Sequence, residues 1–161
     1  MSLSDISMAR LNEVHPELKR RMIQLDTMIP SVCLQVTQGL RTWGQQNVLW
    51  EQGRTTAGPV VTNAPAGFSS HNFGYAVDVV PEDIIPGQPD WNISHIGWQK
   101  ILATAPSVGL AEGAEWKTFT DNPHLYLQEL PADPTDEMRQ QFTDGGMQEV
   151  WANFPLGENA T

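Results

Sequence analysis

The spacing of apolar residues predicts two short helices at the start of the chain. Ser4 is placed to cap the first helix, and His15 and Pro16 mark the start of a second, because proline suits the first helical turn. Apolar residues then recur at helical spacing, at Leu18, Met22, Leu25 and Ile29. Pro30 ends the element. His15 is therefore interpreted as a residue that begins a helix and not as a ligand.

The next segments alternate between regular structure and a long loop. Residues 31–39, "SVCLQVTQG", alternate apolar and polar side chains, which predicts a strand. Residues 42–53 predict a helix that Gly53 closes. Residues 54–70 are rich in Gly, Pro, Thr, Asn and Ser, and they exceed the length of a usual connection. Loops of that length are often functional, so this one is a candidate wall of a site.

The second half of the chain predicts two further strands. Residues 75–80, "YAVDVV", form a strand that places Ala76, Asp78 and Val80 on one face and Tyr75, Val77 and Val79 on the other. A helix is expected over 92–107, a strand over 124–130, and a last helical region from Thr135 with an interruption at Gly145 and Gly146. The helices flank a few strands that mostly do not alternate with them, so we expect the α+β class.

Composition narrows the kinds of protein that this chain can be. The 161 residues, 40% of them hydrophobic, indicate one domain with a real core, spanning 1–161. The net charge of −10 argues against nucleic acid and anionic membranes as partners, although solubility alone also explains it. A single cysteine excludes an internal disulfide. We find no run of 18 apolar residues and no secretory signal at the N-terminus, and we therefore expect no membrane insertion.

Candidate chemistry begins with the aspartate inside the strand at 75–80. Asp78 is costly there unless it is paired or bound to a metal, and the nearest candidate partner is His71. These two residues alone would equally suit a hydrogen-bonded pair. His124, at the start of another strand, supplies a third group. Two histidines and one aspartate can hold three positions of a tetrahedral zinc, which leaves the fourth for water.

A hydrolytic zinc site also needs a general base that is not a ligand. Asp121, three residues before His124, suits that role, but "DNP" is also a good turn sequence. Arg41 follows the first predicted strand and would add a positive charge for a developing oxyanion. An ordinary surface arginine is the alternative. Arg54 is a second candidate for local positive charge.

The pattern Ser69, His71, Gly74, Ala76 and Asp78 resembles the S-x-H-x-x-G-x-A-x-D signature of the zinc D-Ala-D-Ala peptidase family. The family includes VanX-like dipeptidases, VanY-like carboxypeptidases and phage endolysins. The segment "GAEWKTFTDNPH" resembles the second motif of the endolysin branch, and "QGLRTWGQQNVLWEQGRT" resembles its first block. The resemblance covers about residues 14–127. It departs at Ala114, where glycine is frequent in the family, and in "HLYL", where phenylalanine more often follows the histidine.

The resemblance implies roles for individual residues. It makes His71, Asp78 and His124 the ligands of Zn²⁺, Asp121 the catalytic base and Arg41 the group that stabilises the tetrahedral intermediate. Gly74 and Ala76 would leave room beside the metal. Ser69, Gln45 and Trp116 would contact substrate, although Trp116 also suits the core. The implied fold is the small antiparallel sheet, flanked by helices, of the VanX and Hedgehog-like zinc peptidases.

The same resemblance implies a function. The segment from Asp121 to His124 resembles the matching motif of the L-alanyl-D-glutamate endopeptidases, which cut the stem peptide of peptidoglycan. The expected protein is a monomeric phage endolysin with no separate wall-binding domain. It would stay in the host cytoplasm until a holin releases it to the periplasm and the cell wall.

Two other functions stay open at this point. One is a D-Ala-D-Ala dipeptidase or carboxypeptidase, which would release D-alanine. The other is a non-catalytic zinc module that binds wall or protein partners, and the presence of Asp121 argues against it.

Overall fold

The computed structural model describes residues 3–82, 88–113 and 121–156. Its centre is a four-stranded sheet in the order β1-β2-β4-β3, in which every neighbouring pair is antiparallel. The strands are β1 (Leu34–Gln38), β2 (Ala76–Pro81), β3 (Leu110–Glu112) and β4 (His124–Leu127). The expected α+β class with a small antiparallel sheet is confirmed.

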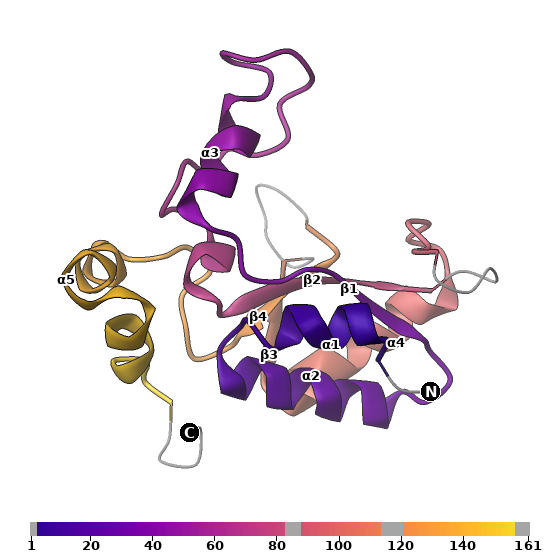
Figure 1. Ribbon diagram of the computed structural model, residues 1–161. Helices are drawn as coiled ribbons and strands as arrows, with labels where there is room; N and C mark the ends of the chain where they lie inside the picture. The colour runs from indigo at the N-terminus through magenta and orange to yellow at the C-terminus, as the bar shows by residue number, and fades with distance from the viewer. Residues whose placement is uncertain (1–2, 83–87, 114–120, 157–161) are drawn as a thin grey trace.

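Helices surround this sheet unevenly. The described helices are α1 (Asp5–Leu11), α2 (Pro16–Met28), α3 (Trp43–Glu51), α4 (Ile96–Thr104) and α5 (Asp136–Ala152), with 3₁₀ turns η1 (Ser70–Phe73) and η2 (Ala105–Val108). In Figure 1, α1, α2 and α4 lie together below the sheet, whereas α3 stands above it and α5 lies to one side. The space above the strands is therefore left to loops and to α3.

The alternation predicted for β2 decides which of its residues face the helices. Tyr75, Val77 and Val79 belong to the hydrophobic core, which they share with residues of α2 such as Leu18 and Met22. Each of them is fully buried. Asp78 has the opposite orientation because successive side chains of a strand point to opposite faces. The polar residue of β2 therefore leaves the core intact and faces the open side of the sheet.

The start of α4 corrects one prediction. The helix expected over 92–107 begins only at Ile96, after a turn in which the Asn92 side chain accepts the Ser94 N–H. It changes to 3₁₀ geometry at Ala105, next to Pro106. Asparagine and serine side chains compete with helical hydrogen bonds, and proline removes one, so both ends of the apolar pattern lie outside the α-helix.

The strands β4 and β3 also differ from the prediction. β4 ends at Leu127, because residues 128–130 turn away and the Leu130 N–H bonds the Leu127 carbonyl. β3 was not predicted, because three residues are too few for a period to be visible. It pairs with β4 from Leu110 opposite Leu127 to Glu112 opposite Leu125.

The predicted interruption of the last helix is confirmed. Helical structure runs from Asp136 to Ala152, but Gly146 has φ 69° and ψ −160°, which lie outside the helical region. The second half of α5 can therefore turn back toward the domain. There the Trp151 indole donates a hydrogen bond to the Phe73 carbonyl at 2.8 Å.

None of the helices in the described ranges is long and apolar enough to cross a membrane.

Candidate metal centre and cleft

The register of β2 and β4 brings two of the predicted ligands together. Asp78 lies directly opposite His124 in this antiparallel pair. Side chains that are directly opposite point to the same face and approach closely. The pairing therefore places a carboxylate and an imidazole side by side on the open face of the sheet, although 46 residues separate them in the chain.

The third ligand comes from the turn before β2. η1 holds His71, and it ends at Gly74, whose φ of 67° is a left-handed conformation that favours glycine. A Cβ at Gly74 would also lie 3.0 Å from the Trp151 ring. The crowding at Gly74 therefore comes from Trp151 and not from the candidate metal ligands. The sharp turn lets the chain enter β2 while His71 stays beside the strand.

The three side chains have the geometry of a metal site. The Nε2 atom of His71 lies 3.2 Å from Asp78 Oδ1, and the Nδ1 atom of His124 lies 3.3 Å from the same oxygen. One ligand atom from each of the three residues lies within 4.8 Å of the others. Ligands bound at about 2.0–2.2 Å in a tetrahedron lie about 3.3–3.6 Å apart, so the two distances to Asp78 are close to those of a zinc site.

Neighbouring groups orient the two imidazoles. The Nδ1 atom of His71 lies 3.0 Å from the Gly39 carbonyl oxygen. A carbonyl oxygen can only accept a hydrogen bond, so Nδ1 carries the hydrogen and Nε2 keeps a lone pair that can bind a metal ion. The Nε2 atom of His124 lies 3.1 Å from Ser70 Oγ, which leaves Nδ1 facing Asp78. The sequence analysis missed Gly39 and Ser70, because hydrogen bonds between distant segments leave no local pattern.

A bulge at the end of β1 leads into the position of Gly39. Val36 pairs with Val79 and Gln38 with Asp78, so Thr37 is the extra residue. Such bulges bend a strand and often lie beside active sites. The chain leaves the sheet there toward His71.

Electrostatics keep Asp78 ionised. Burial acts to raise the pKa of Asp78, but the interactions of its carboxylate with His71 and His124 outweigh burial and hold the pKa far below its usual range. The carboxylate form is the one that ligates metals.

The predicted base, Asp121, lies against the same group of residues. Its N–H donates to the Gly113 carbonyl at 3.0 Å, and its carbonyl accepts the His124 N–H at 3.2 Å. Burial, followed by the Asp78 carboxylate, raises the pKa of Asp121, while His124, His71 and Arg41 oppose that rise. A carboxylate with a raised pKa is a better general base near neutral pH.

Gly113 allows this close approach, and the sequence analysis did not identify it. A Cβ there would lie 2.6 Å from the Asp121 carbonyl oxygen and 3.0 Å from the His124 Cβ. Backbone atoms cannot move away cheaply, so a side chain at Gly113 would displace both residues.

Arg41 also lines the site and is held there by a buried glutamine. The Nη1 atom of Arg41 donates to Gln46 Oε1 at 2.9 Å, and Gln46 itself is fully buried. Gln46 Nε2 donates to the Ala64 carbonyl at 2.7 Å, which connects α3 to the long loop. Within the described part of the chain, the buried Nε atom of Arg41 has no hydrogen-bond partner.

These side chains line one cleft of about 820 Å³. A volume in this range suits a ligand larger than a single amino acid. The lining includes all three candidate metal ligands and, in addition, Asp121, Arg41 and Ser69. The walls are completed by apolar residues, namely Leu49, Val60, Val61, Phe68 and Trp91. The long loop at 54–70 therefore forms one wall, as its length suggested.

Two of the residues expected at or near the site, Gln45 and Arg54, are placed differently, and a third is not among the residues that the structure describes. Gln45 is exposed and absent from the described cleft lining, because its side chain accepts the Thr42 N–H in a capping box. Gln46, one position later, faces inward instead. Arg54 stacks on the Trp50 ring and donates to the Trp50 carbonyl, so it braces the loop. Trp116 lies outside the described residues.

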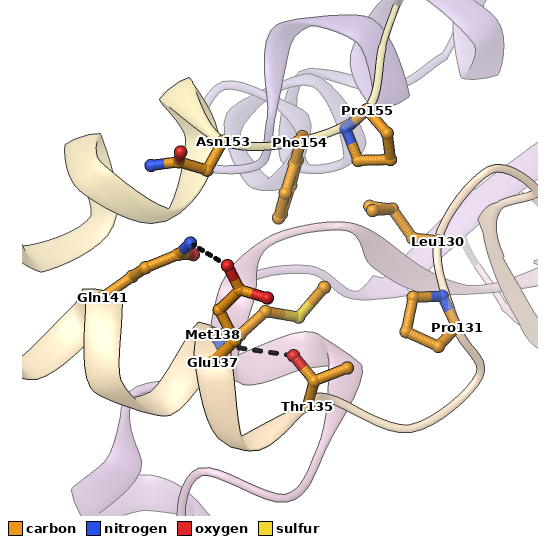
Figure 2. Close-up of a pocket in the computed structure, with 9 residues that line it drawn as sticks. All are labelled: Leu130, Pro131, Thr135, Glu137, Met138, Gln141, Asn153, Phe154 and Pro155. Carbon is orange, nitrogen blue, oxygen red and sulfur yellow. Dashed lines mark hydrogen bonds between the residues drawn. The ribbon is translucent and has the colours of Figure 1, made fainter.

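A second, smaller hollow of about 270 Å³ lies away from these groups. Figure 2 shows it between the two halves of α5 and the segment at Leu130 and Pro131, with Phe154 pointing into it. Glu137 and Gln141 at its edge are bonded to each other. None of the candidate metal ligands lines this hollow, so the chemistry belongs to the larger cleft.

Comparisons with known proteins agree with this geometry. The sequence profile of the D-alanyl-D-alanine carboxypeptidase family matches residues 62–127. The peptidoglycan L-alanyl-D-glutamate endopeptidase CwlK of Bacillus subtilis is 31% identical over an alignment of 125 positions, and the alignment covers 72% of this chain and 74% of CwlK.

Solved structures share the fold. The L-Ala D-Glu endopeptidase ChiX of Serratia marcescens is 28% identical, with a TM-score of 0.55 over 75% of this chain and 85% of ChiX. A D,D-pentapeptidase VanY mutant from a VanB-type resistance cassette, solved with Zn(II), has a TM-score of 0.53 over 85% of this chain and 83% of its own. At 14% identity, VanY supports the fold alone.

Proposed function

This chain belongs to the D-alanyl-D-alanine carboxypeptidase family of metallopeptidases, and from that premise we propose that it is a zinc-dependent endopeptidase that hydrolyses the L-alanyl-D-glutamate bond of the peptidoglycan stem peptide. The observation that carries the proposal is the group of His71, Asp78 and His124 with Asp121 in one cleft. Both CwlK and ChiX are named for cleavage of this bond.

In this proposal His71, Asp78 and His124 hold the zinc ion. Bound zinc would lower the pKa of a water ligand toward about 7 and polarise the substrate carbonyl. The donor set suits that ion, because it combines two nitrogens and one carboxylate at tetrahedral spacing. A fourth position remains for water or substrate.

The side chains of the cleft supply the remaining steps. Asp121 takes a proton from the attacking water and passes it to the leaving amine of D-glutamate. Arg41 donates a hydrogen bond to the oxyanion that forms on the L-alanine carbonyl oxygen. Burial acts to lower the pKa of Arg41, but Asp78 and Asp121 oppose it, and the guanidinium stays charged. Ser69 lines the cleft as a group that orients substrate.

Mass spectrometry of digested peptidoglycan tests the proposed bond. Purified protein with zinc is expected to leave L-alanine on the muramoyl group and to expose the amine of D-glutamate. A chelator should abolish this product, and added zinc should restore it. Release of D-alanine with the L-alanyl-D-glutamate bond intact would contradict the proposal and favour the carboxypeptidase alternative.

The role of Asp121 has its own test. Asp121→Ala should lower turnover by at least about 100-fold, because general base catalysis contributes about 10²–10⁴-fold. Zinc content measured by metal analysis should stay at one ion per chain. Asp144→Asn, an exposed change on α5, is the matched control and should keep full activity. Turnover that survives Asp121→Ala would show that another group is the base.

We further propose that the chain acts as a phage endolysin that a holin releases from the cytoplasm. The support is the segment from Asp121 to His124, which resembles the endolysin branch of the family. Expression in a Gram-negative host should cause lysis with a co-expressed holin and no lysis without it. Lysis without the holin would contradict this setting but not the chemistry.

A further inference from the structure

The rim of the cleft carries a tryptophan that the proposed chemistry does not use. Trp91 lines the cleft, yet 60% of its surface is exposed. An indole of this size usually buries its rings, so an exposed one at the edge of a site is a candidate contact for a ligand. Its position does not result from a place in the core.

The backbone around Trp91 is held firmly. The Asp90 N–H donates to the Pro81 carbonyl at 2.8 Å, at the end of β2. The Asp90 carbonyl accepts the Trp98 indole N–H at 2.9 Å, and Trp98 is buried in α4. The Asn92 N–H bonds Asp90 Oδ1 at 2.8 Å. Trp91 therefore follows a residue, Asp90, that is hydrogen-bonded to both a strand and a helix. These bonds fix the backbone from which the indole extends.

The segment that carries Trp91 and the long loop both contribute to the lining of the cleft. In Figure 1, residues 88–95, which precede α4, rise above the sheet at the opposite end from α3 and the loop that follows it. That loop brings Val60 and Val61, about half exposed, to the wall of the cleft. A ligand that fills the cleft can therefore contact both the aliphatic side chains of the loop and the aromatic ring at the rim.

The chemistry of the substrate suggests which of its parts an uncharged ring at the rim suits. Among the described lining residues, Arg41 is the only arginine or lysine, while Asp78, Asp121 and Asp133 are acidic. The stem peptide carries its carboxylates on the D-glutamate side of the scissile bond. On the other side, L-alanine joins the lactyl group of N-acetylmuramic acid, a neutral unit up to the sugar ring. A flat indole suits the C–H face of a pyranose and not a carboxylate.

We propose, resting on the function proposed above, that Trp91 binds the sugar ring of the N-acetylmuramoyl group to which the stem peptide is attached. The protein would then prefer stem peptides that are still joined to the glycan over free peptides of the same sequence. Trp91 positions the substrate and takes no part in bond cleavage.

Kinetics on two matched substrates test this inference. One is a disaccharide carrying the stem peptide, and the other is the same stem peptide with an N-acetyl group on L-alanine in place of the sugar. Trp91→Ala should raise KM for the disaccharide peptide by about tenfold, with kcat within about twofold, since losing an aromatic contact weakens binding by about that factor. KM for the N-acetyl peptide should not change. Trp91→Phe should recover most of the lost affinity.

Ile93→Ala is the control in the same segment, because Ile93 is 46% exposed and does not belong to the described lining of the cleft. It should leave both substrates unaffected, and circular dichroism should show that every variant is folded. Equal effects of Trp91→Ala on both substrates, or no effect on either, would overturn the inference. Failure of the wild-type protein to cut either substrate at the L-alanyl-D-glutamate bond would instead overturn the proposed function.

Discussion

At the scale of single residues, each of the two imidazoles has one nitrogen that is held by a neighbouring group and one that faces Asp78. In His71 the Gly39 carbonyl occupies one nitrogen, and in His124 the Ser70 hydroxyl does so. The other nitrogen of each ring lies against Asp78. Groups that orient ligands in this way raise metal affinity because the rings need not be ordered when the ion binds.

Ser70→Ala should therefore weaken zinc binding by about 10- to 100-fold, the usual cost of losing a group that orients a ligand. Zinc affinity measured by competition with a chelator checks this. Ser69→Ala is the control, because Ser69 also lines the cleft but Ser70 is the serine whose hydroxyl lies beside His124 Nε2. It should keep the affinity for zinc. Equal zinc affinities in the two variants would mean that the Ser70 hydroxyl does not orient His124.

At the scale of elements, buried charges connect α2 to the far edge of the sheet. Arg21 bonds Glu17 at 2.7 Å within the helix, Glu129 at 2.7 Å beyond β4, and the Gly109 carbonyl at the end of η2. Hydrogen bonds from Arg20 lower the pKa of Glu17 to about 2, with Arg21 adding to this and burial opposing it. The network closes the side of the molecule away from the cleft.

Glu17→Gln should reduce stability in a way that depends on pH. The folded protein holds the pKa of Glu17 below its ordinary value, so its contribution is full above about pH 4.5 and is lost as the pH falls toward about 2. A difference of this size corresponds to about 3 kcal/mol at neutral pH. Urea unfolding at pH 7 and at pH 2.5 measures it. Glu13→Gln, at an exposed position, should change stability little at either pH.

At the scale of the whole molecule, the hydrophobic core and the candidate metal centre occupy opposite faces of one sheet. The core residues of β2 and β4 pack with the N-terminal helices, while Asp78 and His124 face the cleft. The metal centre joins η1, β2 and β4, and the core does not depend on it. The fold should therefore persist without zinc, although zinc should stabilise it by binding only the native state.

Thermal unfolding with and without zinc tests that separation. Free zinc at about 100 times its Kd should add about 2.7 kcal/mol. For a chain of this length the melting temperature would then rise by about 5–10 °C. His71→Ala should remove the response to zinc while leaving a cooperative transition. A metal-free protein without a cooperative transition at 25 °C would show that the core depends on the ion.

Local patterns were sufficient for the elements whose residues interact with close neighbours in the chain. Helix caps, the alternation in β2 and the glycine in α5 were predictable because a cap, a strand face and a backbone conformation depend on adjacent residues. The motif from Ser69 to Asp78 indicated two of the candidate metal ligands because several fixed positions lie within ten residues.

The orienting groups and the cleft walls depended on the folded chain. Gly39, Ser70 and Gly113 meet the histidines and Asp121 only after β2 has paired with β1 and β4, and no local period records such contacts. The choice of Gln46 over Gln45 follows from which side of α3 faces the loop at 62–64. Trp91 reads as an ordinary apolar residue in the chain, and its exposure at the rim follows from the anchoring of Asp90 between β2 and Trp98. The proposed type of chemistry was therefore indicated by local sequence, whereas the groups that orient the candidate ligands and the walls of the cleft came from segments that tertiary pairing brings together.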